Sequence, residues 1–574
     1  MKDLDHLSWD EWDELHSPRP ERTEFDDVVD RAVSRRGFLT GVLAIGSGAA
    51  VMGTGVGALL GSTSAARAQA AMFPFEGIPA YTDGTVHVPE GYDCDVVARW
   101  GDALFSDAEA FDPATGITVA SSDRVFGENT DGMEAFEIDG RQIIAVNHEY
   151  ANPESNLPQL AEDAVYSADD VQLLKNIQGV TVMEIAETGD GWQIVVDSPY
   201  NRRIHHDTPM TIAGPLAGHD MLKTSADPEG TTVLGTLNNC GSGKTPWGTY
   251  LTCEENFNGY FGASDPASVD TPAFKRYGVE AESRYQYEKQ DARFDVTAEP
   301  NEPNRFGYIV EIDPSDASST PVKRTALGRF KHENAAAVLA PNGQVVVYLG
   351  DDERGEYLYK YVSNGTYTEG GSSEGLLDDG KLFAAKFNDD MTGEWVELTP
   401  EATGMDAMEV LVHTRMAASA VGATTMDRPE WVAVNPVAAQ GYCALTNNSR
   451  RGVRPNAGGD PTPVGGPNPR AENNYGQVVR WIPDGEDHAA ATFAWDLYVM
   501  AGNPIVGQGD YAGSDNINEG NLFNSPDGMM FDSRGTLWIQ TDGDDSNEGP
   551  YTGMGNNQML AGDPASGEIR RFLT

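Results

Sequence analysis

Basic residues are scarce in this sequence. Its 574 residues include 39 Lys and Arg against 89 Asp and Glu, which gives a formal net charge of −50 at pH 7. Nucleic acids and anionic membrane surfaces attract clustered positive charge, so this balance argues against either as a specific partner. We expect most of the acids to form a charged, solvated surface. Acids that a pattern places at the ends of strands need a separate explanation.

Helical periodicity is also rare. The one segment with a convincing helical pattern runs from Ser167 to Asn176, with Ser167 as its predicted N-cap. Other apolar runs are short and lie between turns rich in the 63 Gly and 33 Pro residues, which is typical of many strands. We therefore expect an all-β fold with a few short helices.

Cysteine is limited to four positions: Cys94, Cys240, Cys253 and Cys443. Outside the cytoplasm four cysteines could form two disulfides, and their spacing does not select partners. Cys253 differs from the rest because it follows a strand-like segment and precedes Glu254 and Glu255. A thiolate beside carboxylates at the end of a strand is a credible ligand for a transition metal.

The N-terminal part of the chain has the order of an export signal. Ser34-Arg35-Arg36-Gly37-Phe38-Leu39 precedes a Gly- and Ala-rich apolar run, which is followed by Ala66-Arg67-Ala68. This order predicts a twin-arginine signal peptide over residues 1–68 with an A-x-A cleavage site. The apolar run, about 23 residues long, could also anchor the chain in a bilayer, but its glycines and the cleavage site favour a signal. We expect the twin-arginine machinery to export the protein to the periplasm or the medium.

Five stretches of the remaining chain repeat one pattern, in which a polar residue opens a strand and a second polar cluster closes the next. They run from Glu134 to Glu149, Trp247 to Asn256, Glu333 to Asp352, Glu430 to Arg450, and Asp527 to Asp544. In an antiparallel hairpin the start of one strand and the end of the next share an edge, so these groups should meet. A crowd of carboxylates is unstable without cations, so the repeat suggests a metal site.

Repeated strand units can form a propeller, a β-helix or a sandwich. Here the units are unevenly spaced and separated by long polar inserts at 201–244, 259–304, 364–380 and 451–472, which disfavours a β-helix. A propeller also accounts for polar strand ends that converge on one axial opening. We therefore expect residues 69–574 to form a single β-propeller domain.

Several motifs, in one order, resemble those of the PhoX family of exported alkaline phosphatases. The family-like stretches are Asn147-His148-Glu149-Tyr150, Pro246-Trp247-Gly248-Thr249, Cys253-Glu254-Glu255-Asn256, Lys331-His332-Glu333-Asn334, Tyr357-Leu358-Tyr359-Lys360, Arg428-Pro429-Glu430-Trp431, Thr446-Asn447-Asn448-Ser449-Arg450, Ser525-Pro526-Asp527-Gly528 and Leu537-Trp538-Ile539-Gln540-Thr541-Asp542. The resemblance covers most of the mature chain and includes the twin-arginine signal.

The resemblance implies a six-bladed propeller, active as a monomer, that hydrolyses small phosphate monoesters with Fe³⁺ and Ca²⁺. It assigns the iron-bound thiolate to Cys253 and the phosphate-binding role to Arg428. Carboxylate ligands are expected from Glu149, Glu254, Glu333, Glu430 and Asp527, and Glu333 is also expected to be catalytic. Iron accepts thiolate and carboxylate together, and calcium accepts six to eight oxygens, so these residue types fit both metals.

Several neighbouring residues stay open between two roles. His332 is either a ligand or a packed histidine, and Arg450 either binds phosphate or pairs with an acid. Three acids either bind calcium or close loops: Asp351, Asp352 and Asp542. His205, His206 and Asp207 form a metal-like cluster in an insert, for which we expect surface contacts instead.

Two other functions are compatible with a propeller of this kind. A calcium-dependent lactonase would share the Ser-Pro-Asp-Gly and Leu-Trp-Ile phrases but would have no need of a thiolate ligand. A non-catalytic binding propeller would keep calcium for stability alone. Iron in the purified protein, and loss of hydrolysis without Cys253 or Arg428, would favour the phosphatase.

Overall fold

The computed structural model describes residues 72–161, 164–189, 191–544 and 546–574. The chain divides into two compact units, Met1–Glu76 and Gly77–Thr574. Only residues 72–76 of the first unit are described, and the predicted signal peptide at 1–68 lies outside the described residues. No helix in the described ranges is long and apolar enough to cross a membrane.

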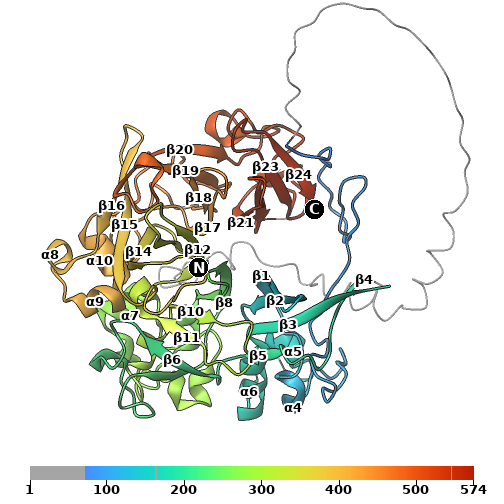
Figure 1. Ribbon diagram of the computed structural model, residues 1–574, viewed down its shortest axis with the longest axis vertical. Helices are drawn as coiled ribbons and strands as arrows, with labels where there is room; N and C mark the ends of the chain where they lie inside the picture. Colours follow the sequence, from blue (N-terminus) through green and yellow to red (C-terminus); the bar gives the residue numbers. More distant parts are fainter. Residues whose placement is uncertain (1–71, 162–163, 190, 545) are drawn as a thin grey trace, which may run out of the picture. The chain divides into compact units, whose positions relative to one another are not determined.

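The regular secondary structure of the second unit is mostly strands, which form four sheets (Figure 1). The first sheet contains β1 (Thr130–Ile138), β2 (Arg141–His148), β3 (Gly179–Thr188), β4 (Gly191–Ile194) and β5 (Arg202–Ile204). The second contains β6 (Pro209–Ala213), β7 (Thr232–Leu234), β8 (Asn239–Lys244), β9 (Tyr250–Glu254), β10 (Ile309–Ile312) and β11 (Val322–Arg324).

The third sheet has nine strands, and its two edge strands come back to lie side by side. In chain order they are β12 (His332–Leu339), β13 (Gln344–Asp351), β14 (Leu358–Thr366), β15 (Gly380–Phe387), β16 (Thr392–Glu397), β17 (Pro429–Val434), β18 (Gly441–Leu445), β19 (Gln477–Pro483) and β20 (Thr492–Met500). The sheet runs from β12 to β16, continues through β20, and ends at β17. The fourth sheet contains β21 (Pro526–Phe531), β22 (Leu537–Thr541), β23 (Met559–Gly562) and β24 (Ile569–Leu573).

Helices are few and short, as the sequence predicts. Among the described residues the α-helices are α4 (Val119–Ser122), α5 (Pro153–Asn156), α6 (Ala168–Ile177), α7 (Pro272–Tyr277), α8 (Pro400–Thr403), α9 (Ala407–Val412) and α10 (Thr414–Ala420). The prediction for α6 is confirmed within one residue. Its first turn is closed by a capping box, in which the Asp170 amide donates to Ser167 Oγ and the Ser167 amide to Asp170 Oδ2.

The first strand of each long hairpin lies innermost, and these strands follow one another around the middle of the unit (Figure 1). β1 packs beside β8, β8 beside β12, β12 beside β17, and β17 beside β21. The approach is close enough to require glycine. A Cβ on Gly243 would lie 1.9 Å from the Ala335 carbonyl oxygen, and one on Gly350 would lie 2.3 Å from the Glu430 carbonyl oxygen.

Apolar side chains fill the spaces between neighbouring sheets. One cluster joins the first and second sheets through residues such as Val180, Val182 and Tyr250, and another joins the end of the nine-stranded sheet to the fourth through Tyr442 and Met529. Strands with a sheet or helix on each side are buried on both faces, which is why β13 is apolar along most of its length. The fold is mostly β, and its inner strands position the polar groups described next.

Candidate metal centre

Each innermost strand carries one extra residue at its start, so its register shifts against the neighbouring strand. The shifts fall at Thr130/Met133 in β1, Asn239/Ser242 in β8, His332/Ala335 in β12, Pro429/Val432 in β17 and Pro526/Met529 in β21. Such a bulge turns a side chain that would otherwise follow the pleat. The second residue of each shifted segment forms the set we call the inner positions: Asp131, Cys240, Glu333, Glu430 and Asp527.

Four of the five inner positions share a further backbone feature. The residue two places earlier has a positive φ, with 43° at Asn129, 50° at Asn238, 55° at Arg428 and 48° at Ser525. Few residues other than glycine adopt this conformation, and it concentrates at functional sites. Because the positive φ recurs at equivalent places, these four strands begin with the same backbone conformation.

The residue that directly follows the second strand forms a matching set, the outer positions: Glu149, Glu255, Asp352, Thr446 and Asp542. Each donates its amide to the carbonyl of the residue two before the inner position, at 3.0, 3.0, 3.1, 3.2 and 3.1 Å respectively. The polar pattern in the sequence therefore corresponds to a structural repeat. It brings seven carboxylates and one thiol into two groups and a pair, with Glu255 beside them.

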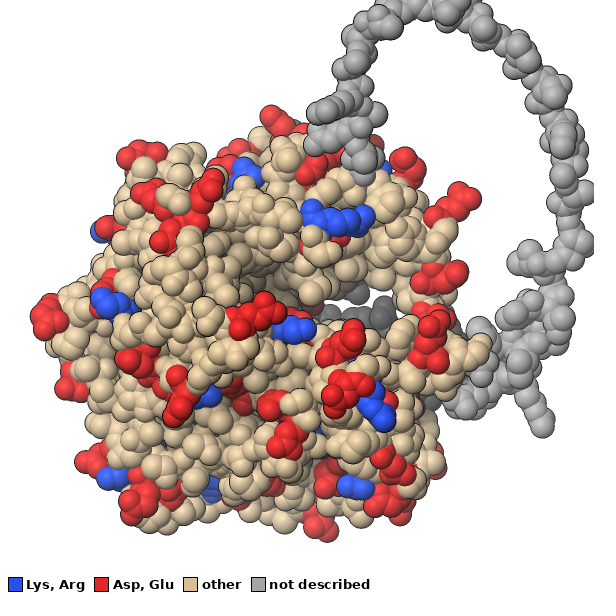
Figure 2. Space-filling model, in the orientation of Figure 1, with Lys and Arg blue, Asp and Glu red and all other residues tan. Residues whose placement is uncertain are grey.

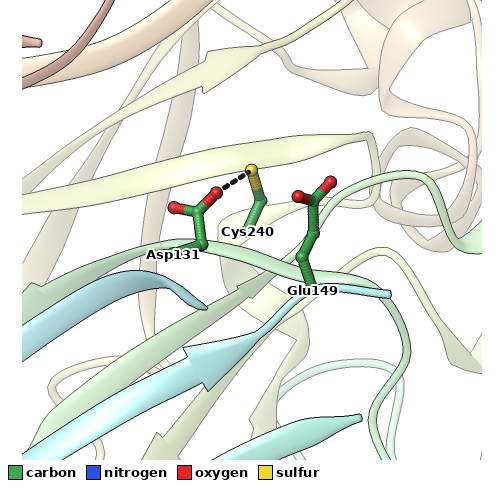
Figure 3. Close-up of side chains that lie close together, drawn as sticks. All are labelled: Asp131, Glu149 and Cys240. Atoms are coloured by element: carbon green, nitrogen blue, oxygen red, sulfur yellow. Dashed lines mark hydrogen bonds between the residues drawn. The ribbon is translucent and has the colours of Figure 1, made fainter. Parts of the chain in front are cut away.

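The first group consists of Asp131, Glu149 and Cys240, whose ligand-type atoms all lie within 4.8 Å of one another (Figure 3). Cys240 Sγ lies 3.4 Å from Asp131 Oδ2. The Cys240 backbone is held by Asn147, whose Nδ2 donates to the Cys240 carbonyl at 2.6 Å. The Asn147 side chain of the first sheet thus holds the backbone that carries the Cys240 thiol in the second sheet.

The second group consists of Glu333, Asp352 and Glu430, which are all buried and likewise lie within 4.8 Å of one another. Cys240 joins the two groups, because its Sγ lies 3.3 Å from Glu333 Oε1. Arg428 borders this group. Its guanidinium donates to Asp352 at 2.9 and 2.7 Å and lies 3.0 Å from Glu430 Oε1.

Asp527 and Asp542 extend the centre from the fourth sheet. Burial and then the charges of Asp542 and Asp131 raise the pKa of Asp527, and the two charge effects place the three carboxylates near one another. Asp527 Oδ1 is buried and accepts no hydrogen bond from any described residue. A buried carboxylate oxygen without a donor is what a cation site leaves when only protein atoms are considered.

The electrostatics of the centre disfavour the ionisation of all these groups in the absence of cations. Burial raises the pKa of Asp131 to about 6 and that of Glu149 to about 8, with the neighbouring carboxylates adding to both shifts. Burial, followed by nearby carboxylates, also raises the pKa of Glu333, Glu430 and Asp527 well above the usual value. The Cys240 thiol is affected in the same way, since burial and then four acids raise its pKa. Bound metal would reverse these shifts.

The predicted ligands Glu149, Glu333, Glu430 and Asp527 lie at inner or outer positions, as the repeat requires. The structure also adds Asp131, which the sequence pattern passed over in favour of Glu134. Burial raises the pKa of Glu134 to about 7, but that residue faces Lys244 and belongs to neither group. Asp131 is followed by Gly132, as Cys240 and Asp527 are followed by glycine, and this is the signal that could have found it.

Two predicted ligands are not brought into the centre. Cys253 is fully buried in an apolar cluster with Leu251 and Ile309 and belongs to neither group, so the thiol in the centre is that of Cys240. Glu254 points away from it and pairs with Lys323 Nζ at 2.7 Å. The structure thus places Cys240 and Glu255, rather than the predicted Cys253 and Glu254, at the inner and outer positions, since a sequence does not show the register that decides which side chain faces inward. All four cysteines are free.

Several residues left open by the sequence now have defined surroundings. Asp352 belongs to the second group, whereas Asp351 pairs with Arg415. His332 is a packed histidine, with its ring stacked on Phe330 at 3.7 Å and Nε2 3.0 Å from the Gly328 carbonyl. The expectation of surface contacts is wrong for His206, which is fully buried with its ring edge against Tyr260.

Acidic side chains are spread across the face of the molecule shown in Figure 2, and basic ones are sparse there. The expected charged surface is therefore present. It differs from the centre in that its carboxylates are exposed, whereas Glu333, Glu430 and Asp352 are at most 8% exposed.

Comparisons with known proteins agree with this geometry. The model of the family "Alkaline phosphatase PhoX" matches residues 73–574. The chain is 50% identical to the structure of Pseudomonas fluorescens PhoX in complex with vanadate, a transition state analogue, over 87% of this chain and 89% of that one, with a TM-score of 0.83.

Other matches are remote. A structure from the GH130 family of mannoside phosphorylases is 9% identical over 85% of this chain and 97% of that one, with a TM-score of 0.29. A putative 6-phosphogluconolactonase from Bacteroides uniformis is 9% identical over 68% and 90%, with a TM-score of 0.22. Neither carries an argument about function, and no curated protein matches the chain. The family match over nearly all described residues shows that the chain belongs to the PhoX family of alkaline phosphatases.

Proposed function

We propose that this enzyme hydrolyses small phosphate monoesters at a centre of iron and calcium held by the inner and outer positions. The observation that carries the proposal is the Cys240 thiol, which joins two groups of three metal-type ligands. A thiol among carboxylates suits a transition metal such as iron, and a site for calcium alone would have no use for it. The family membership supports phosphoester hydrolysis.

The donor set supports both metals. Asp131, Glu149 and Cys240 would hold iron together with Glu333 of the second group. Oxygens from Asp352, Glu430, Asp527 and Asp542 offer the all-oxygen surroundings that calcium prefers. Bound ions of this kind supply Lewis acidity toward phosphoryl oxygens and make an oxygen nucleophile available near neutral pH.

The chain's own residues would bind and orient the substrate around these ions. Arg428 is paired with two acids of the second group, and its side chain is 20% exposed, so it can contact a substrate. Its planar fork matches the oxygens of a phosphoryl group, and its bonds to Asp352 and Glu430 hold it in place. Glu333 lies where the two groups meet and would position the reacting oxygen between them.

The proposal extends to the architecture of the domain, its export and its oligomeric state. The radial order of the five inner strands supports a propeller as the form of the single domain at 69–574, and its six blades are inferred from the family resemblance. The motif at Arg35-Arg36 supports export through the twin-arginine machinery to the periplasm or the medium. We expect the active protein to be a monomer.

Phosphate release from p-nitrophenyl phosphate tests the proposed function. Protein loaded with iron and calcium should hydrolyse it, protein stripped by a chelator should not, and vanadate should inhibit, given the vanadate complex of the 50% identical structure. A fully metallated sample that releases phosphate from neither this ester nor nucleotides and sugar phosphates would refute it.

A further inference from the structure

The last residue of two second strands is a buried acid that points away from the centre. Glu254 ends β9 and precedes Glu255, and Asp351 ends β13 and precedes Asp352. Successive side chains of a strand point to opposite sides, so an acid at one position leaves its neighbour on the other. Which of the two adjacent acids faces the centre is therefore decided by what holds the first.

Asp351 is held by Arg415 from α10. Arg415 Nε lies 2.8 Å from Asp351 Oδ2, and Nη2 lies 2.5 Å from Oδ1, in a forked arrangement. The side chains of Arg415 and Asp351 are 2% and 0% exposed. Glu356 Oε2 lies 3.8 Å from Arg415 Nε, and it also accepts a hydrogen bond of 2.6 Å from Nη2 of Arg276, which belongs to α7.

Glu254 is held in a similar way by Lys323, a cation on β11 of the same sheet. Lys323 Nζ of β11 lies 2.7 Å from Glu254 Oε1, and both side chains are at most 1% exposed. The other carboxylate oxygen accepts from the backbone amides of Gly307 and Tyr308 at 3.0 and 3.1 Å. Every oxygen of this acid is thus occupied on the side away from the centre.

We propose that Arg415 and Lys323 are positioning residues, which pin Asp351 and Glu254 outward so that Asp352 and Glu255 face the metal centre. The inference rests on the proposed function, because it assigns these cations a role in holding that centre together. Asp352 is a member of the second group. Its backbone amide donates a hydrogen bond to the Lys331 carbonyl, which fixes the backbone but does not decide the direction of the side chain. Without the outward pin the end of β13 would no longer hold Asp352 toward the centre, and an unpaired Asp351 would in addition compete for the same ions.

The test compares metal binding by variants of the Asp351–Arg415 pair. Arg415→Gln leaves Asp351 unpaired, Arg415→Lys keeps the charge without the fork, and the double variant Asp351→Asn with Arg415→Gln removes both charges. Leu382→Ala is the control for destabilisation, since Leu382 is a buried, uncharged residue of an apolar cluster and belongs to neither metal-type group. Metal per chain is measured by elemental analysis, and metal dependence by titrating stripped protein with calcium and iron.

Arg415→Gln and the double variant should need about 10- to 100-fold more metal for half-saturation, the range seen when groups that support metal ligands are lost. The KM for p-nitrophenyl phosphate at saturating metal should stay near that of the unaltered protein. Arg415→Lys should recover part of the affinity. Leu382→Ala should melt earlier but bind metal normally below its transition. Lys323→Gln, which leaves Glu254 of the second sheet without its cation, should also raise the metal concentration needed for half-saturation.

Normal metal affinity in a folded Arg415→Gln or double variant would overturn the inference. So would a loss of affinity in Leu382→Ala equal to that of Arg415→Gln, because destabilisation alone would then explain it. If both pair variants fail to fold while Leu382→Ala folds, the pair serves folding and the inference also falls. Absence of metal from the unaltered protein would instead refute the proposed function.

Discussion

Replacing Cys240 with alanine should destroy the centre, whereas the same change at Cys253 should be nearly silent. Cys240 Sγ lies 3.4 Å from Asp131 and 3.3 Å from Glu333, so its loss removes the atom that joins the two groups. Loss of a group that only supports a ligand reduces activity or affinity about 10- to 100-fold, so losing a ligand should reduce kcat/KM by at least about 100-fold.

Cys253→Ala removes one buried sulfur from an apolar cluster, which costs about 1 kcal/mol. With an unfolding entropy of about 2 cal/mol/K per residue over about 500 residues, the melting temperature should fall by only about 1 °C. Hydrolysis of p-nitrophenyl phosphate, melting temperature and metal per chain are measured for both variants. Equal loss of metal and activity in the two, or retention of both in Cys240→Ala, would refute the assignment.

Three further predictions follow from the geometry of the centre. Arg428→Ala should lower kcat/KM by about 100-fold while elemental analysis finds near-normal metal, because its charge-assisted bonds would serve the substrate more than the ions. In stripped protein the raised folded pKa values of Asp131 and Glu149, about 6 and about 8, predict stability that is complete at low pH and lost as pH rises through these values. A melting temperature of stripped protein that rises between pH 5 and 9 would contradict this, and added metal should flatten the dependence. Gly243→Ala should destabilise the fold by at least about 1–3 kcal/mol in denaturant unfolding, since its Cβ would lie 1.9 Å from the Ala335 carbonyl oxygen, and Gly189→Ala, with open space around it, is its control for added bulk.

The sequence was sufficient to predict the repeat and most of the acids. Polar clusters at alternate strand ends are visible without a structure, and antiparallel pairing alone brings them to one edge. Glu149, Glu333, Glu430 and Asp527 were found in this way. The helix at Ala168–Ile177 was found from its capping residue and its apolar spacing.

The sequence could not predict which of two neighbouring residues faces inward. One inserted residue in β1 and β8 moves Asp131 and Cys240 into the inner positions, and no local propensity marks such a bulge. At Glu254 and Glu255 the choice depends on Lys323, which lies far along the chain and pairs only after the sheet has formed. An error of one register step therefore accounts for Glu254 alone, whereas Asp131 and Cys240 were missed because the bulges that turn them inward cannot be read from the sequence.

Elemental analysis of purified protein tests the central claim most directly. If the inner and outer positions form a polymetal phosphatase centre, the unaltered protein should contain both iron and calcium, and Cys240→Ala should lose the iron. Protein that contains neither metal, or that keeps its iron when Cys240 is replaced, would contradict the account.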